Sequence, residues 1–175
     1  MKLRADVCWC KESKTYIGSA HFGGELDTLG EVPHFKGRLY KTLAMVCVVG
    51  CRLRVEVEIT STGEWLWAEY DSMAVESETE NFRLHVTGYH GNAGDAFNDD
   101  HNEKWQSNGM EFSTPDGDND LFPTTHCASD SGWWFRKCSS SALNRTTNAF
   151  WYSTTGPTAA RPVSASRMML QCGDG

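Results

Sequence analysis

Three aspartates at every second position of a short polar loop are the residues of this chain best suited to bind a metal ion. They are Asp116, Asp118 and Asp120, and Gly117 and Asn119 separate them. Ca²⁺ takes about six to eight oxygen ligands, which carboxylates and backbone carbonyls of a flexible loop can provide. A solvated acidic loop without metal is the alternative, because three alternating acids are only part of a full calcium motif.

An EF-hand does not account for this loop. An EF-hand loop that began at Asp116 would need glycine at its sixth position and a bidentate glutamate at its twelfth. Those positions hold Leu121 and Cys127. A calcium ion bound here would therefore lie in an irregular loop.

The aspartates belong to a longer series of motifs. The series contains NGMEFSTPDGDND at 108–120, CASDSGWWFRKC at 127–138 and LN at 143–144. It follows a long segment at 53–97 and precedes fainter similarity at 150–153 and 167–170. In sequence and in order, these segments resemble the C-terminal two thirds of a fibrinogen-related domain (the fibrinogen C-terminal domain family, which includes ficolins, tachylectins and angiopoietins).

The resemblance implies a calcium site and a disulfide bond. Side chains of Asp118 and Asp120 and backbone carbonyls of Phe122 and Thr124 would bind Ca²⁺, with waters as the remaining ligands. Asp116 would hold the loop by hydrogen bonds. The two cysteines of the CASDSGWWFRKC motif, Cys127 and Cys138, would be bonded to each other. Here the segment between Asp120 and Cys127 is one residue longer than is usual in the family.

In lectins of this family, the resemblance also implies a pocket for acetyl groups beside the calcium loop. Aromatic side chains wall the pocket, and a cis peptide bond precedes the second cysteine. Carried over, the cis bond is Lys137–Cys138, and the wall draws on Trp133, Trp134 and Phe135. Core packing is the alternative for both tryptophans, and for Trp133 we expect it instead of contact with the ligand. The candidate ligand-binding residues are Trp134, Phe135, Lys137, Cys138 and Ser139.

This pocket departs from the family pattern, whereas the acidic loop keeps it. Ser139 follows the second cysteine, where acetyl-binding lectins commonly have histidine. Arg145, Thr146 and Thr147 follow the LN motif in place of glycine and aromatic residues. Asn144-Arg145-Thr146 is also an acceptor sequon for N-glycosylation.

Hydrophobic periodicity predicts an antiparallel sheet that positions these loops. Apolar and charged residues alternate strictly over Leu53–Ile59, and a turn at 61–63 leads into an aromatic-rich return strand over Trp65–Tyr70. Residues 82–87 predict a third strand, and Ser77 is a candidate cap for a helical turn at 77–80. Together with the resemblance, this predicts an α+β fold that is mainly antiparallel sheet with short helices and a loop-rich, calcium-binding C-terminal subdomain.

Other segments predict less regular structure. Residues 88–94 read as a loop, and Asp95 as the cap or start of a short helix. Residues 18–39 are rich in glycine and predict loop or disorder, and residues 153–166 predict a loosely ordered end. The apolar run Leu43–Val49 fits a buried strand and is shorter than the roughly 20 residues that span a bilayer.

The domain organisation follows from where the resemblance begins. We expect residues 1–50 to be a non-matching segment and residues 51–175 to be a partial fibrinogen-related domain, with the family's usual N-terminal subdomain missing or replaced. The N-terminus lacks the apolar stretch of a secretory signal, although the family is extracellular and secreted. A truncated or alternatively spliced product, or an incorrectly predicted gene, would explain both features.

Composition excludes several classes of function. A net charge of −7 argues against nucleic acid or an anionic membrane as the main partner. The sequence has no GxSxG or HExxH motif, so we expect no enzyme. The seven cysteines are an odd number, so at least one thiol is free or joins an oligomer, and the pairing of Cys8, Cys10, Cys47, Cys51 and Cys172 stays open.

Two kinds of binding function remain. One is an extracellular, calcium-dependent lectin-like module that binds acetylated glycans or other surface ligands in innate defence. The other is a protein-interaction or signalling ligand of the angiopoietin kind. An incomplete domain without activity of its own is a third alternative.

Overall fold

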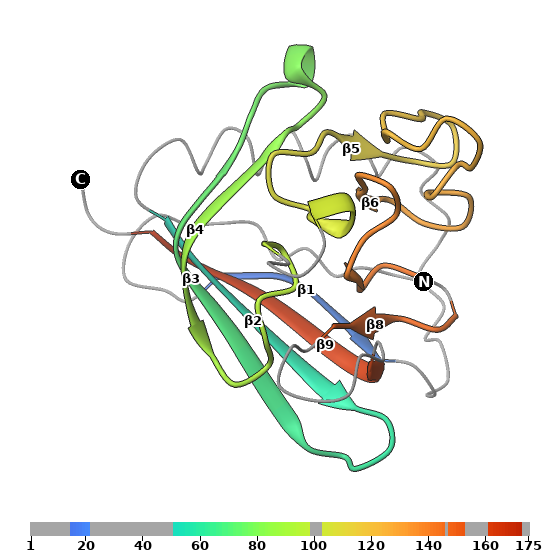
Figure 1. Cartoon of the computed structure of the whole chain (residues 1–175). Helices are drawn as coiled ribbons and strands as arrows, with labels where there is room; N and C mark the ends of the chain where they lie inside the picture. The colour runs from blue at the N-terminus through green and yellow to red at the C-terminus, as the bar shows by residue number, and fades with distance from the viewer. Residues whose placement is uncertain (1–14, 22–50, 99–102, 146, 153–160, 173–175) are drawn as a thin grey trace, which may run out of the picture.

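The structure is a computed structural model that describes residues 15–21, 51–98, 103–145, 147–152 and 161–172. These residues form nine strands and two 3-10 turns of three residues each (Figure 1). The strands are β1 (Thr15–His21), β2 (Cys51–Ile59), β3 (Trp65–Val75), β4 (Leu84–Gly91), β5 (Phe112–Ser113), β6 (Trp133–Trp134), β7 (Ser141–Ala142), β8 (Phe150–Trp151) and β9 (Arg161–Cys172); the 3-10 turns are η1 (Glu78–Glu80) and η2 (Glu103–Trp105). The predicted antiparallel sheet is confirmed, since every strand pairing is antiparallel.

The β2–β3 hairpin is the element that sequence periodicity predicted best. Val55 lies opposite Ala68 and Val57 opposite Leu66, and these four side chains are buried on one face. Glu56 and Trp67, on the other face of the same strands, are only partly buried. Strict alternation therefore correctly predicted which face of β2 is buried, and a slip of one residue in the pairing would have turned that face toward solvent.

Strands β3 and β4 extend beyond their predicted ends. Strand β3 continues to Val75, and β4 begins at Leu84 and reaches Gly91, so the prediction of a loop over 88–94 is wrong for 88–91. Pairing with β3 decides the outcome, because Glu69 lies opposite His90 and Ala68 opposite Gly91. Glycine suits this end of the strand, since Gly91 has a φ of 143° and a Cβ there would lie 2.3 Å from the Trp67 carbonyl oxygen.

Strand β9 occupies the middle of the sheet, which corrects the prediction of a loosely ordered segment over 153–166. The strand order is β4-β3-β2-β9-β8-β7, and β1 also pairs with β9. Leu170 lies opposite Leu53 and Ser166 opposite Val57, and all four side chains are buried. The backbone partners on both sides order residues 161–166, whatever their weak local preference. Strand β1 likewise includes residues 18–21, which were predicted as loop; residues 22–39, 43–49 and 153–160 lie outside the described residues.

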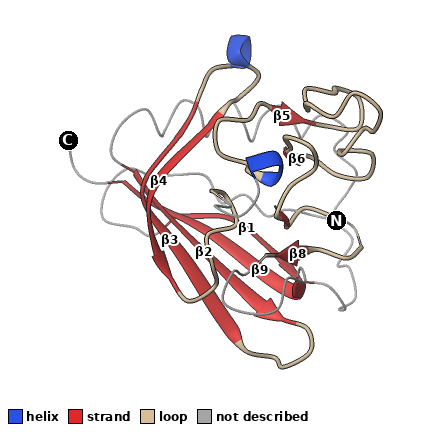
Figure 2. Cartoon of the chain, in the orientation of Figure 1, coloured by secondary structure: helices blue, strands red, loops and turns tan. Residues whose placement is uncertain are grey.

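Helical structure in the described part of the chain is limited to the two 3-10 turns (Figure 2). Ser77 is the N-cap residue of η1, as predicted, but its side chain makes no capping hydrogen bond and its hydroxyl lies 2.6 Å from that of Thr79. Asp95 starts no helix, although its carboxylate accepts a hydrogen bond of 3.1 Å from the backbone N–H of Asn98, as a cap would. No helix in the described residues is long and apolar enough to cross a membrane.

One aromatic cluster joins the sheet to the loop-rich region that lies beside it (Figure 1). The ring of Phe97 lies 5.3 Å from Tyr70 of β3, 5.4 Å from Trp151 of β8 and 6.0 Å from Trp133 of β6, measured between ring centroids. All four side chains are almost fully buried. Burial of such large rings is the main source of stability expected for this contact, and it fixes the position of β6 within the loop-rich region.

Candidate functional site

The disulfide bond between Cys127 and Cys138 confirms the predicted pairing. The two Cα atoms are 5.1 Å apart. The bond closes a segment of about a dozen residues, for which chain entropy gives roughly 3 kcal/mol of stabilisation, and this segment contains β6. Cys51 is also disulfide-bonded.

Strand pairing places the acidic loop beside the disulfide-closed segment. Phe112 of β5 pairs with Trp134 of β6, and the ring of Phe112 lies so close to Gly132 that a Cβ there would be 2.7 Å from the ring. After β5 the chain turns tightly, since Thr114 and Gly117 exchange N–H···O bonds of 2.9 and 3.0 Å. Two further hydrogen bonds fold the loop back onto β5: the Asn119 side-chain amide donates to the Phe112 carbonyl at 2.7 Å, and the Asn119 backbone N–H donates to the Ser113 hydroxyl at 3.1 Å.

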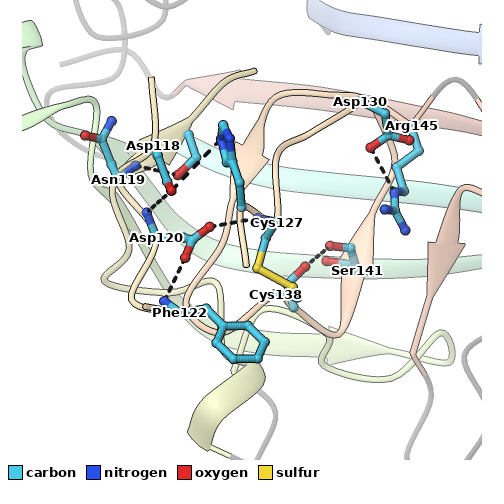
Figure 3. Close-up of a disulfide and its surroundings, with 12 residues drawn as sticks. Asp118, Asn119, Asp120, Phe122, Cys127, Asp130, Cys138, Ser141 and Arg145 are labelled. Atoms are coloured by element: carbon cyan, nitrogen blue, oxygen red, sulfur yellow. Dashed lines mark hydrogen bonds and ion pairs between the residues drawn. A yellow bond between two sulfur atoms is a disulfide. The ribbon is translucent and has the colours of Figure 1, made fainter. Parts of the chain in front are cut away.

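The Asp120 carboxylate connects the acidic loop to the disulfide. One oxygen accepts a hydrogen bond of 2.7 Å from the backbone N–H of Phe122, and the other accepts one of 2.9 Å from the backbone N–H of Cys127 (Figure 3). Asp118 accepts a bond of 3.2 Å from the backbone N–H of Asp120. Asp118 is half-exposed, and the His126 ring nitrogen lies 4.0 Å from its carboxylate. The two carboxylates therefore differ, since Asp120 organises the backbone and Asp118 faces solvent.

The peptide bond between Lys137 and Cys138 is trans, so the predicted cis bond is wrong. All peptide bonds between described residues are trans. The chain turns instead at Cys138, whose φ is 59°, and the backbone N–H of Arg136 donates to the Cys138 carbonyl at 3.0 Å. A left-handed residue costs about 1–2 kcal/mol and a cis bond before a non-proline residue about 3–4 kcal/mol. The backbone N–H of Leu121 donates to the Arg136 carbonyl at 2.6 Å, which ties this turn to the acidic loop.

The aromatic residues of the predicted pocket are packed inside the protein. Trp133 stacks on Phe97, as expected of a core residue. Trp134 and Phe135 are only 3% and 2% exposed, and the Trp134 indole donates a hydrogen bond of 2.9 Å to the Phe82 carbonyl. Packing therefore accounts for the positions of all three rings. Contact of Trp134 or Phe135 with a ligand stays a prediction.

The polar residues of the predicted pocket lie at the turn around the second cysteine. Lys137 is exposed, Cys138 is partly buried and Ser139 is buried. The Ser139 hydroxyl donates to the Ser141 carbonyl, so this side chain already has a partner within the protein. Of this group, Lys137 has the side chain that is most open to a ligand.

On the far side of the disulfide from the acidic loop, Arg145 bridges two loops (Figure 3). Its guanidinium lies 3.3 Å from the Asp130 carboxylate and 5.9 Å from the centre of the Phe150 ring. The neighbouring Asn144 side chain donates a hydrogen bond of 3.1 Å to the Gly132 carbonyl. An N-linked glycan would replace one of the two hydrogens on the Asn144 side-chain nitrogen, so only the other hydrogen could make this bond.

Sequence reasoning missed the η2 turn as a neighbour of the second cysteine. The backbone N–H of Lys137 donates to the Lys104 carbonyl, and that of Ser140 donates to the Trp105 carbonyl, each at 3.0 Å. The Trp105 side chain is 43% exposed. A tryptophan within a polar stretch was the available signal, but the sequence does not show which loop it lies against.

Sequence reasoning also missed polar contacts made by Tyr70 of β3 and by Asn108 at the edge of β4. The Tyr70 hydroxyl donates a hydrogen bond of 2.8 Å to Asp95. Burial, together with the nearby Asp95 carboxylate, raises the pKa of Tyr70 well above its usual range. The side chain of Asn108 pairs with both the N–H and the carbonyl of Val86, each at 2.9 Å, and so takes the place of a neighbouring strand at the edge of β4.

Comparison with known proteins identifies the family to which these features belong. The family model described as "Fibrinogen beta and gamma chains, C-terminal globular domain" matches residues 41–158. The chain belongs to the fibrinogen C-terminal domain family. Its fold agrees, because the fibrinogen-like globe domain of human ANGPTL2 superposes with a TM-score of 0.71 at 24% identity, over 98% of this chain and 86% of that domain.

Relatives of known sequence match this chain over only part of their own length. Human fibroleukin is 42% identical over 94 residues, which is 53% of this chain and 21% of fibroleukin. Protein scabrous of Drosophila melanogaster is 35% identical over 128 residues, 69% of this chain and 14% of scabrous. A techylectin-like protein of Phoneutria nigriventer is 42% identical over 81 residues, 45% of this chain and 33% of that protein. The chain thus spans a third or less of the length of these relatives.

The calcium ion that the fibrinogen family implies can be tested against the donor atoms of the loop. Each carboxylate oxygen can accept more than one interaction, so the hydrogen bonds made by Asp118 and Asp120 leave acceptor capacity for a cation. The Phe122 carbonyl accepts a bond of 3.2 Å from Thr125 N–H and has a second lone pair. No group of three His, Cys, Asp or Glu side chains converges as a metal site within the described ranges. A calcium ion in this loop would therefore need carbonyls and water as ligands beside the two carboxylates, and the predicted set of ligands stays a prediction.

Proposed function

We propose that this fibrinogen C-terminal domain is an extracellular, calcium-dependent recognition module that binds acetylated glycans on surfaces and serves in innate defence. The observation that carries the proposal is the hydrogen bonding of Asp120 to the backbone of Phe122 and Cys127. Through it, the loop that would bind the ion and the segment that carries the candidate ligand residues form one unit. An ion in the loop would thereby influence the surface around Cys138. We propose no enzymatic activity.

In this proposal, Asp118 and Asp120 hold the ion with the carbonyls of Phe122 and Thr124. When bound, calcium supplies positive charge that offsets the repulsion between neighbouring carboxylates. Asp116 holds the loop by hydrogen bonds. The Asp120 hydrogen bonds and the disulfide limit the conformations that the loop can adopt.

A protein-interaction or signalling function is the second candidate. It is favoured by the changed pocket, where Ser139 is buried against Ser141 and Arg145 is engaged with Asp130. Lamprey fibrin D-dimer, which shares the fold at a TM-score of 0.66 and 22% identity, is described as a complex with the peptide ligand Gly-His-Arg-Pro-amide. An oligomer and a domain without activity of its own are further alternatives.

A glycan array separates the two candidates. We expect the purified protein to bind acetylated sugars in millimolar calcium and to lose this binding in EDTA and in Asp118→Ala. The protein is checked for folding in both buffers by tryptophan fluorescence. A folded protein that binds no glycan under either condition would refute the lectin function and favour the protein ligand.

A further inference from the structure

Two neighbouring cations at the C-terminal end of the disulfide-closed segment differ from most other described cations of this acidic protein. Five described arginines lie within 4 Å of a carboxylate: Arg52, Arg54, Arg83, Arg145 and Arg167. Arg136 and Lys137 make no ion pair with any residue of the described part of the chain. The chain has a net charge of −7, yet the positive charges of Arg136 and Lys137 are not paired with a carboxylate of the described residues.

An exposed aromatic ring belongs to the segment beside them. The η2 turn lies beside residues 137–140. The backbone N–H of Lys137 donates to the Lys104 carbonyl, and that of Ser140 donates to the Trp105 carbonyl. Backbones paired in this way lie about 5 Å apart. Trp105 is 43% exposed and Lys137 is also exposed, so a cation and an aromatic surface are available on adjacent segments.

The same turn is attached to the acidic loop. Leu121 donates to the Arg136 carbonyl at 2.6 Å, so Arg136 directly adjoins the segment that follows Asp118 and Asp120. A divalent cation held by these two carboxylates would offset negative charge on the segment next to Arg136. A ligand that approaches this surface then meets positive charge and an exposed indole.

We propose that the surface formed by Trp105, Arg136 and Lys137 binds an anionic saccharide, with its sulfate or carboxylate group on the cations and a sugar ring on the indole. This inference rests on the proposed recognition function and names the ligand class of that site. Charge complementarity favours an anion, and an aromatic side chain presents a broad apolar surface with a polar edge, which suits the mixed apolar and polar surface of a sugar. A neutral acetylated sugar would use neither cation.

The test compares three sugars on one protein. Binding of the full chain to a sulfated heparin oligosaccharide, to sialyllactose and to the neutral, acetylated chitotriose is measured by calorimetry in millimolar calcium at low and at physiological salt. We expect the sulfated or the sialylated sugar to bind at least about fivefold more tightly than chitotriose. This advantage should shrink at higher salt, because exposed charges are screened. The two anionic sugars distinguish sulfate from carboxylate recognition.

Matched variants locate the binding surface. Lys137→Glu and Trp105→Ala change exposed side chains, and each should weaken binding of the anionic sugar by about threefold to tenfold, the range expected for an exposed ion pair or an aromatic contact. Arg52→Glu makes the same charge reversal at an exposed arginine that already pairs with Asp71, and it should change binding by less than about twofold. The melting temperature of each variant shows whether it is folded.

Each outcome has a distinct meaning. Calcium-dependent binding of chitotriose that equals binding of the anionic sugars would overturn the anionic ligand and leave the lectin function in place. Absence of binding to all three sugars by the folded protein would remove the proposed function itself. If Arg52→Glu weakened binding of the anionic sugar as much as Lys137→Glu does, a specific sugar site at this turn would be overturned. The same conclusion would follow if a polyglutamate peptide bound as tightly as the anionic sugar and Lys137→Glu abolished that binding.

Discussion

The clearest perturbation of the calcium loop compares Asp118→Ala with Asp120→Ala in the absence of metal. Asp120 accepts two backbone hydrogen bonds, of 2.7 and 2.9 Å, whereas Asp118 accepts one of 3.2 Å and has a half-exposed side chain. Hydrogen bonds to charged groups contribute about 1.5–3 kcal/mol each when buried. Partial exposure reduces this, so we expect a loss of about 2–3 kcal/mol for Asp120→Ala and about 0.5 kcal/mol for Asp118→Ala.

These free energies correspond to separable melting temperatures. For a chain of this length, 1 kcal/mol shifts the melting temperature by about 2–4 °C. In EDTA, Asp120→Ala should therefore melt about 4–12 °C below wild type, and Asp118→Ala within about 2 °C of it. Calcium at a hundredfold excess over its Kd should raise the free energy of unfolding of wild type by about 2.7 kcal/mol. Both variants should lose most of this increase.

The assay is thermal unfolding followed by tryptophan fluorescence, with each protein melted in EDTA and in calcium. Asn in place of Asp120 serves as a matched control, because it keeps one acceptor oxygen and should fall between wild type and alanine in EDTA. Equal melting temperatures of the two alanine variants in EDTA would refute the argument from hydrogen bonds. A wild-type melting temperature indifferent to calcium would mean that the DGDND loop is only a solvated turn.

Two further predictions concern Tyr70 and Asn144. Burial raises the pKa of Tyr70 in the folded state, so the unfolded chain loses this proton near pH 10 while the folded chain keeps it. The free energy of unfolding should therefore fall as pH rises above about 10. In denaturant titrations at several pH values, Tyr70→Phe should reduce this dependence of the free energy of unfolding on pH. Secreted protein should carry N-glycan on Asn144, seen as a mass decrease on enzymatic deglycosylation and lost in Asn144→Gln; an unmodified Asn144 peptide would contradict it.

Local sequence determined the features that a single short pattern specifies. Alternation over Leu53–Ile59 predicts an extended strand with one apolar face, and a slip of one residue in its pairing would expose that face. The spacing of the three aspartates likewise restricted the loop to metal binding or solvation. The family motif supplied the pairing of Cys127 with Cys138, which spacing alone did not.

Tertiary pairing decided what local sequence left weak. Residues 161–166 have little preference of their own, yet they form part of β9 because β8 supplies backbone partners at 161–162 and β2 supplies them from Val163 onward. The same holds for the end of β4, where glycines that suggest a loop pair with β3. Strand preference depends on neighbours as much as on residue type, so a sequence read locally misses strands of this kind.

The details of the candidate site also required the three-dimensional structure. Sequence identified Trp134 as an aromatic residue near the second cysteine, but Trp134 is buried where it pairs with β5 and donates to the Phe82 carbonyl, and both partners are distant in the chain. The trans bond before Cys138 depends on a left-handed turn that residue types did not indicate. The proximity of Trp105 to Ser140 rests on one backbone hydrogen bond across 35 positions, and no local pattern encodes such a contact, because each segment satisfies its own local preferences without it.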